Sequence, residues 1–226
     1  MEGLLRVIDL GSVPFDAAMR VQKECLSEAL GRPGTHSIIF CSHQPVITCG
    51  TAHRASDILA DYQTLKEMNI NVRQVDRGGG VSYHGPGQIT VYPVFNLACM
   101  TKDIGWFIRR LEECVAVFLS RFGVDSARKE GFPGVWTGSR KICSIGVGFS
   151  KWVSFHGLSV NIRKEDMRAY SLIRPCGMDI KMACLEEESP QAEAHDYAGM
   201  ISVLLQSFIN VFWPRGIQTE EIKKCL

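Results

Sequence analysis

The sequence predicts a single α/β domain in which a mixed β-sheet is flanked by helices. Its 226 residues fit one domain. Hydrophobic residues at 46% and charged residues at 22% are ordinary values for a globular protein with a sizeable core. Helical and strand-like segments interleave without a regular βαβ period, and no repeat or linker-like stretch divides them. We therefore treat residues 1–226 as one domain with helices packed on the faces of its sheet.

In the N-terminal half, apolar spacing predicts a helix over residues 16–30, with Gly31 as its stop. A short buried strand is expected over 37–41. A second helix is predicted over 56–68, with Ser56 as its N-cap. Residues 72–75 read as a strand that leads into a glycine-rich segment. Residues 89–95 are rich in β-branched and aromatic residues and predict another strand, in which Pro93 indicates an edge position or a bulge.

In the C-terminal half, the clearest helix is predicted over residues 104–122, where an apolar stripe lies opposite charged side chains. Residues 134–162 return to strand patterns that glycines interrupt. A last helix is expected over 193–212, with its apolar residues at helical spacing.

Composition and charge exclude several classes of protein. The net charge of +1 is not that of a dedicated nucleic-acid binder. The longest apolar run, residues 114–119, is far below the roughly 18 residues of a membrane span. The N-terminus has no secretion signal pattern. Nine scattered cysteines without a CxxC pair or zinc-ligand spacing indicate a reducing compartment and no metal site. We expect a cytoplasmic protein that binds neither membranes nor nucleic acid.

Residues 77–88 form the first segment that could carry chemistry. Five of the eleven residues from 77 to 87 are glycines, which let the backbone approach a ligand closely and expose successive N–H groups. The segment matches no nucleotide-binding fingerprint. A glycine-rich surface turn is the alternative. His84 is either a proton-handling group or a structural residue, and the other histidines outside residues 154–159 are interpreted as structural (His36, His43, His53, His195).

A second candidate segment, residues 138–147, begins a strand with Lys141. Strand alternation places Lys141 on the same face as Cys143, Ile145 and Val147, although lysine is rarely buried without a partner. The alternative is that the ammonium snorkels to solvent. Residues 154–159 form a further backbone-rich wall.

Cys176 is the third candidate, because its flanks differ from those of the other cysteines. Pro175 restricts the backbone before it and Gly177 relaxes the backbone after it, which suits a side chain presented at a sharp turn. A nucleophile needs such presentation, although an ordinary turn needs it too. Most free cysteines are small buried hydrophobes.

Taken together, these segments closely resemble the lipoyl(octanoyl) transferase family in order and spacing, over about residues 4–210. The resemblance implies the mixed sheet and flanking helices of the biotin and lipoate protein ligase catalytic domain. It implies Cys176 as the acyl-accepting nucleophile and Lys141 as its partner. The implied cavity walls are Arg77, Gly78, Gly79, Gly80, Val81, Ser82, Tyr83, His84, Ser144, Ile145, Gly146, Gly157, Leu158 and Ser159. Ser82 stands where the family commonly has threonine, and Arg174 where asparagine is common.

The resemblance also implies a reaction and its partners. An octanoyl group passes from acyl carrier protein to a lysine of a lipoyl domain, through a cysteine thioester and without a cofactor. The acceptors are the lipoyl domains of 2-oxoacid dehydrogenase E2 subunits and the glycine cleavage H protein. Three alternatives remain open: an ATP-dependent lipoate or biotin ligase, an amidotransferase between lipoyl domains, and a fatty-acyl binding module in which Cys176 only packs.

Overall fold

The computed structural model describes residues 3–177 and 179–223, except for the side chains of Cys176 and Lys223. Its larger sheet has the strand order β11-β1-β2-β6-β10-β9-β8-β7, and a smaller sheet has the order β4-β3-β5. The strands are β1 (Leu4–Val13), β2 (Thr35–His43), β3 (Val46–Cys49), β4 (Asn71–Gln74), β5 (Val81–His84), β6 (Gln88–Val94), β7 (Ala127–Lys129), β8 (Phe132–Thr137), β9 (Arg140–Ser150), β10 (Val153–Asn161) and β11 (Gln218–Lys223). The predicted mixed α/β fold is confirmed, because β1 pairs in parallel with β2 and β11 while β6, β8, β9 and β10 pair antiparallel.

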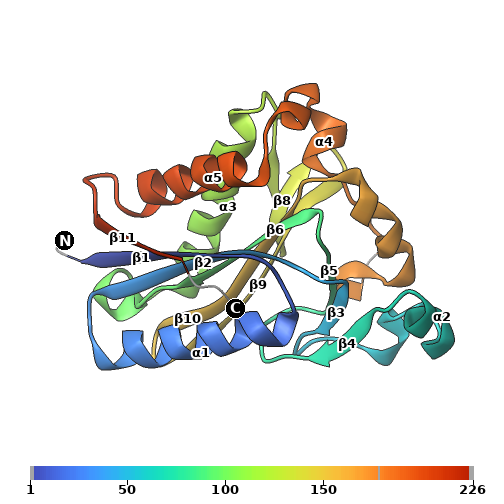
Figure 1. The fold of residues 1–226 in the computed structure, drawn as a ribbon, viewed down its shortest axis with the longest axis horizontal. Coiled ribbons are helices and arrows are strands. Elements are labelled where there is room, and N and C mark those ends of the chain that lie inside the picture. Colours follow the sequence, from blue (N-terminus) through green and yellow to red (C-terminus); the bar gives the residue numbers. More distant parts are fainter. Residues whose placement is uncertain (1–2, 178, 224–226) are drawn as a thin grey trace.

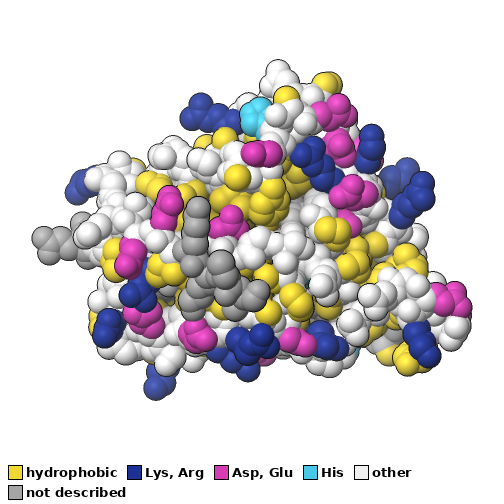
Figure 2. Space-filling model, viewed as in Figure 1, with side chains coloured by type: hydrophobic (Ala, Val, Ile, Leu, Met, Phe, Trp, Pro, Cys, Tyr) yellow, Lys and Arg dark blue, Asp and Glu magenta, His cyan; other side chains and the backbone are white. Residues whose placement is uncertain are grey.

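Helices cover both faces of the larger sheet (Figure 1). The α-helices are α1 (Phe15–Gly31), α2 (Tyr62–Glu67), α3 (Ile104–Ser120), α4 (Leu185–Glu188) and α5 (Tyr197–Phe212), with short 3-10 helices η1 (Ala55–Asp57), η2 (Leu97–Cys99), η3 (Lys164–Leu172), η4 (Pro175–Gly177) and η5 (Pro190–Ala194). Helices α3 and α5 pack on one face and α1 packs on the other, each over its own apolar cluster. Basic and acidic side chains are interspersed over the face shown in Figure 2. Within the described ranges, no helix combines the length and apolar character needed to cross a membrane.

The predicted helices over 16–30 and 104–122 are confirmed within two residues at each end. The Asp103 carboxylate caps α3 by accepting a hydrogen bond from the Trp106 N–H at 2.9 Å. The last predicted helix begins late. Asp196 accepts a hydrogen bond from the Gly199 N–H at 2.8 Å and starts α5 at Tyr197, whereas the preceding residues form η5.

The prediction of one helix over 56–68 is wrong. Residues 55–57 form η1, and the chain then extends so that the Leu59 N–H donates to the Leu172 carbonyl at 2.8 Å. Helix α2 begins only at Tyr62, because Asp61, not Ser56, supplies the cap by accepting from the Thr64 N–H at 2.7 Å. A pairing with a distant segment thus overrides the local helical pattern.

Pro93 does not mark an edge strand, because β6 lies between β2 and β10. The irregularity is in the neighbouring strand instead. The β6–β10 ladder reaches only to the pair Val91 and Leu158, and in β10 His156 has a positive φ of 54°. A Cβ at Gly157 would lie 2.1 Å from the Val91 oxygen and 2.6 Å from Pro93 Cδ, so the close approach there requires glycine.

The buried side chain of His36 should make the folded protein less stable in acid. His36 is 3% exposed, its Nδ1 accepts a hydrogen bond from the Asn96 N–H, and burial lowers its pKa to about 4. Below about pH 6.5 the unfolded chain binds a proton at His36 that the folded protein takes up only near pH 4. As the pH is lowered from about 6.5 to about 4, the free energy of unfolding therefore falls by about 1.4 kcal/mol per pH unit. It is regained when the pH is raised again. In urea titrations from pH 4.5 to 6, His36→Asn should bind about one proton fewer on unfolding, and an unchanged slope would contradict the assignment.

Candidate active site

A narrow cavity of about 40 Å³ lies at the junction of the two sheets. Strand β5 of the smaller sheet walls it on one side, and β6, β9 and β10 of the larger sheet wall it on the other. Its lining residues are Phe15, Thr48, Arg77, Gly79, Val81, Ser82, His84, Thr90, Tyr92, Ser144, Ile145, Gly146, His156, Gly157, Leu158 and Ser159. Segments distant in sequence therefore meet around one small volume.

Eleven of the residues predicted as cavity walls line it: Arg77, Gly79, Val81, Ser82, His84, Ser144, Ile145, Gly146, Gly157, Leu158 and Ser159. Three others do not. The Gly78 N–H donates to the Val147 carbonyl, the Gly80 carbonyl accepts from the Gly50 N–H, and the buried Tyr83 hydroxyl donates to Asp166 at 3.2 Å. These three groups attach the glycine-rich segment to its neighbours.

Four lining residues lie outside every predicted wall segment: Phe15, Thr48, Thr90 and Tyr92. A further one, His156, lies within the wall predicted over residues 154–159. Thr90 and Tyr92 alternate on β6, and Thr48 stands on β3. No local motif distinguishes them in the sequence. Alternation along the predicted strand over 89–95 is the one signal that could have placed Thr90 and Tyr92 on a common face.

Close backbone contact forms one corner of the cavity. Gly146 on β9 pairs with Gly157 on β10, and the segment after Arg77 lies directly over Gly146. A Cβ at Gly146 would lie 2.9 Å from the Gly78 oxygen and 2.9 Å from Arg77 Cδ. A larger residue at position 146 would push this wall outward.

A connected row of hydrogen-bonding groups runs behind the cavity from Arg77. The guanidinium Nη2 donates to Thr48 Oγ1 at 2.8 Å, and Thr48 Oγ1 lies 3.2 Å from His84 Nε2. Burial, with the nearby His43 and Arg77, holds the pKa of His84 well below its usual range, so its ring is neutral near pH 7. His84 Nδ1 lies 2.9 Å from Ser159 Oγ, and Ser159 Oγ lies 3.0 Å from Thr90 Oγ1. Arg77 thus anchors a row of neutral polar groups along the wall.

His43 supports the same wall without lining the cavity. Its Nδ1 donates to the Val13 carbonyl at 3.2 Å, so its Nε2 accepts from the Tyr92 hydroxyl at 2.8 Å. Burial lowers the pKa of His43 to about 4 and raises the pKa of Tyr92 well above its usual value. Both groups therefore remain neutral near pH 7.

Lys141 is buried, and the alternative that its ammonium snorkels is wrong: the residue is 1% exposed. Its Nζ lies 5.4 Å from the ring centroid of Trp136, and Lys129 approaches the same ring from β7 at 3.9 Å. Gly134 leaves room for the side chain, since a Cβ there would lie 2.4 Å from Lys141 Cε. Lys141 does not line the cavity, but it stands on β9 three residues before Ser144, which does.

The prediction that Lys141 and Cys143 point to the same face of the strand is wrong. The register between β8 and β9 shifts there, because Val135 pairs with Cys143 whereas Trp136 pairs with Lys141. Ile142 and Cys143 both belong to the same apolar cluster. A β-bulge therefore turns Lys141 out of phase with the core residues that follow it.

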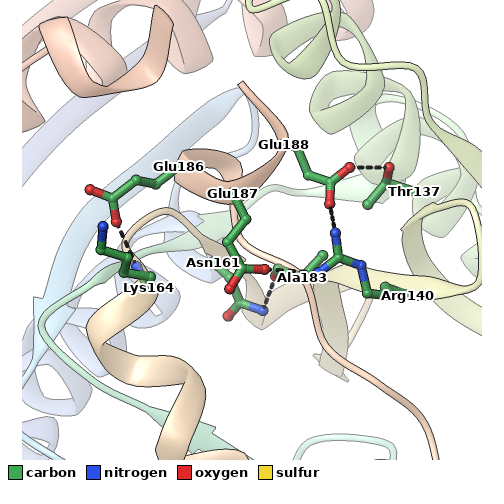
Figure 3. Close-up of polar contacts among 8 residues, drawn as sticks. All are labelled: Thr137, Arg140, Asn161, Lys164, Ala183, Glu186, Glu187 and Glu188. Atoms are coloured by element: carbon green, nitrogen blue, oxygen red, sulfur yellow. Dashed lines mark hydrogen bonds and ion pairs between the residues drawn. The ribbon is translucent and has the colours of Figure 1, made fainter. Parts of the chain in front are cut away.

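The backbone of Lys141 is held by the segment that leads into α4. Its N–H donates to the Lys181 carbonyl and its carbonyl accepts from the Ala183 N–H, both at 2.9 Å. Figure 3 shows how this segment is fixed: Asn161 Nδ2 donates to the Ala183 carbonyl at 2.9 Å, and Arg140 pairs with Glu187 and Glu188. These bonds and the pairing of Lys141 with Trp136 on β8 together hold the start of β9.

The side chain of Cys176 lies outside the described part of the structure, so the predicted pairing of Cys176 with Lys141 stays a prediction. Its backbone is described in η4, which lies against β5 and η1. Gly177 has a positive φ of 70° and donates its N–H to the Arg174 carbonyl, a turn that suits glycine. The Arg174 guanidinium pairs with Asp179 at 3.0 Å, so its charge is partly compensated.

Five of the other cysteines that the structure describes do not have the environment of a nucleophile. Burial raises the pKa of five thiols above the usual value: Cys41, Cys49, Cys114, Cys143 and Cys184. Cys143 is fully buried, and burial outweighs the opposing effect of the nearby Lys141. Within residues 3–177 and 179–223, no group of three or more His, Cys, Asp or Glu side chains could hold a metal ion.

The chain is similar in sequence and in fold to proteins that are already known. The family model of the lipoyl protein ligase A/B catalytic domain matches residues 14–209. An octanoyltransferase of Maridesulfovibrio salexigens is 38% identical over 77% of this chain and 81% of its own length. One from Gloeobacter violaceus is 32% identical over 99% of this chain and 97% of its own. A T. acidophilum protein described as a lipoate protein ligase, solved with bound lipoic acid, has the same fold, with a TM-score of 0.77 and 17% identity over 99% of this chain and 90% of that one.

Proposed function

The chain belongs to the lipoyl protein ligase A/B catalytic domain family, and we propose that it transfers an octanoyl group from acyl carrier protein to a lysine of a lipoyl domain. Relatives named octanoyltransferases that align with most of the chain support acyl transfer. The observation that carries the proposal for this chain is the burial of Lys141. A buried ammonium at the start of a strand that walls a cavity is costly to keep and suits a site that activates a thiol.

Cys176 is the proposed nucleophile and Lys141 its partner. An unperturbed thiol has a pKa of about 8.5 and is only a few per cent thiolate at pH 7. A nearby ammonium that lowers this pKa by about two units needs roughly 2.7 kcal/mol of differential interaction, which one partly desolvated ion pair supplies.

Two acyl transfers follow from this pair. The Cys176 sulfur attacks the thioester carbonyl of the donor, the bond to the carrier's sulfur breaks, and the carrier leaves as a thiol after taking a proton from Lys141. Backbone N–H groups of the glycine-rich walls are proposed to stabilise the oxyanion. The acceptor amine then attacks the acyl group on Cys176, neutral Lys141 takes the amine proton, and the cysteine leaves as thiolate. The donor thioester already supplies the activation, so neither ATP nor a cofactor is needed.

The wall residues divide these tasks by their chemistry. The proposed acyl cavity has Ile145 and Leu158 for apolar contact, and the hydroxyls of Ser159 and Thr90 for the polar end of the group. The cavity is narrow, so an acyl chain has to push side chains aside as it enters. The proposed acceptors are the lipoyl domains of 2-oxoacid dehydrogenase E2 subunits and the glycine cleavage H protein.

The test is transfer in the absence of ATP. Purified protein, octanoyl-acyl carrier protein and a lipoyl domain should give a lipoyl domain that is heavier by one octanoyl group in intact-mass measurement. A lipoyl domain whose target lysine is replaced by arginine is the control and should stay unmodified. Transfer only from free octanoate with ATP would assign the chain to the ligases, and stoichiometric binding without turnover would make it an acyl-binding module.

A further inference from the structure

Two side chains separate the narrow cavity from a much larger open groove. The groove has a volume of about 800 Å³ and lies between α1, the end of β4 and the hairpin that joins β9 to β10. Phe15 and His156 line both the cavity and the groove. We call this pair the partition. Apart from it, none of the residues that line the cavity lines the groove.

The groove is chemically suited to an alkyl chain. Its apolar lining residues beyond the partition are Met19, Leu26, Val75 and Phe155. Its charged residues are at the rim, where Arg73 pairs with Asp16 at 3.0 Å, and both side chains are well exposed. A chain that passed the partition would thus leave a narrow cavity for a roomy and partly apolar one.

The partition is held firmly from the groove side. His156 donates its backbone N–H to Gln22 Oε1 at 3.0 Å, and its Nε2 lies 2.9 Å from Asp76 Oδ1. Its positive φ of 54° sets the direction in which the side chain leaves the backbone. The Phe15 ring packs edge-on against His43 with centroids 5.5 Å apart. An entering acyl chain can displace flexible side chains more easily than either of these two.

We propose that Phe15 and His156 set the upper limit of acyl chain length by closing the far end of the acyl cavity. This inference rests on the proposed function, which makes the cavity the acyl site. With the partition in place, extra methylenes have no room. With either side chain removed, the end of a longer chain enters the groove, and each methylene buried there is worth about fourfold in kcat/KM.

The experiment compares donors of six to fourteen carbons in His156→Gly and Phe15→Ala. Glycine tolerates the backbone conformation of position 156, so this variant removes the ring without adding backbone strain. Leu26→Ala is the matched control, because Leu26 lines the groove alone. The measured quantity is the ratio of kcat/KM for dodecanoyl to that for octanoyl donors. We expect it to rise at least 10-fold over wild type in both partition variants and to stay unchanged in Leu26→Ala.

Thermal midpoints establish that each variant is folded. Because Phe15 is on α1 and His156 is on β10, the two partition variants test the proposal from different elements of the fold. An unchanged ratio in a folded partition variant would overturn the proposal. So would a wild-type protein that accepts all chain lengths equally. If wild type transfers no acyl group at all, the proposed function fails, and calorimetric binding of octanoate and dodecanoate to wild type and His156→Gly still decides whether the partition limits chain length.

Discussion

Incubated with octanoyl-acyl carrier protein alone, the wild-type protein should gain the mass of one octanoyl group, and Cys176→Ser should gain none. The expectation follows from the proposed thioester, because a serine hydroxyl near pH 7 is a far weaker nucleophile than a thiolate. Hydroxylamine should remove the adduct from wild type, as it cleaves thioesters. Intact-mass spectrometry before and after hydroxylamine is the measurement.

Cys143→Ala is the matched control for this experiment. Cys143 lies close in sequence to Lys141, yet its thiol is fully buried and burial raises its pKa. The variant should therefore acylate as wild type does. An adduct that persists in Cys176→Ser and disappears in Cys143→Ala would move the nucleophile to Cys143. Equal thermal midpoints would show that loss of the adduct is not loss of the fold.

Local patterns predict those elements whose signals are complete within one segment. Helix α3 has both an apolar stripe and an Asp103 cap, and its position follows from them. Strands β1 and β11 went unpredicted, because β1 is covered on both faces and β11 is a short, charged strand that exists through its pairing with β1. Strand β5 was absorbed into the glycine-rich segment, since its four residues follow three glycines.

In the candidate site, too, some residues could be predicted from local sequence and others could not. The motif residues were placed together through a family resemblance, and eleven of them meet in the cavity. The remaining walls come from Phe15 on α1, Thr48 on β3, and Thr90 and Tyr92 on β6, whose neighbours are fixed by sheet order and register. His156 lies in a predicted wall, but its conformation could not be predicted. Its positive φ depends on the contacts of β10 with β6 and α1, and no sequence pattern encodes it.

The bulge at the start of β9 explains why alternation misplaced Lys141. Period-two reasoning holds only for a regular ladder, and the shift between the pairs Val135–Cys143 and Trp136–Lys141 breaks it. The consequence is functional in the proposed scheme. Lys141 occupies a space that Gly134 leaves open beside Trp136, and Ile142 and Cys143 fill the core.

Lys141→Met should slow alkylation of Cys176 by iodoacetamide about 20-fold at pH 7. The variant keeps the length and apolar stem of the side chain but loses the cation, so the thiol pKa should rise from about 6.5 toward about 8.5. The midpoint of the alkylation rate against pH should move up accordingly. Lys129→Met is the matched control. It removes the other ammonium over the same Trp136 ring, from a strand that does not wall the cavity, and should leave the midpoint in place.

Lys141→Arg separates the electrostatic role of Lys141 from its role as a base. Guanidinium keeps the positive charge, yet it does not deprotonate in proteins and cannot take the proton of the acceptor amine. Acylation of Cys176 by the donor should remain measurable, whereas transfer to the lipoyl domain should fall at least 100-fold. Single-turnover kinetics of each half-reaction, followed separately, give both rates. Wild-type transfer in Lys141→Arg would remove Lys141 from the base role, and an unchanged alkylation midpoint in Lys141→Met would remove it from the neighbourhood of Cys176.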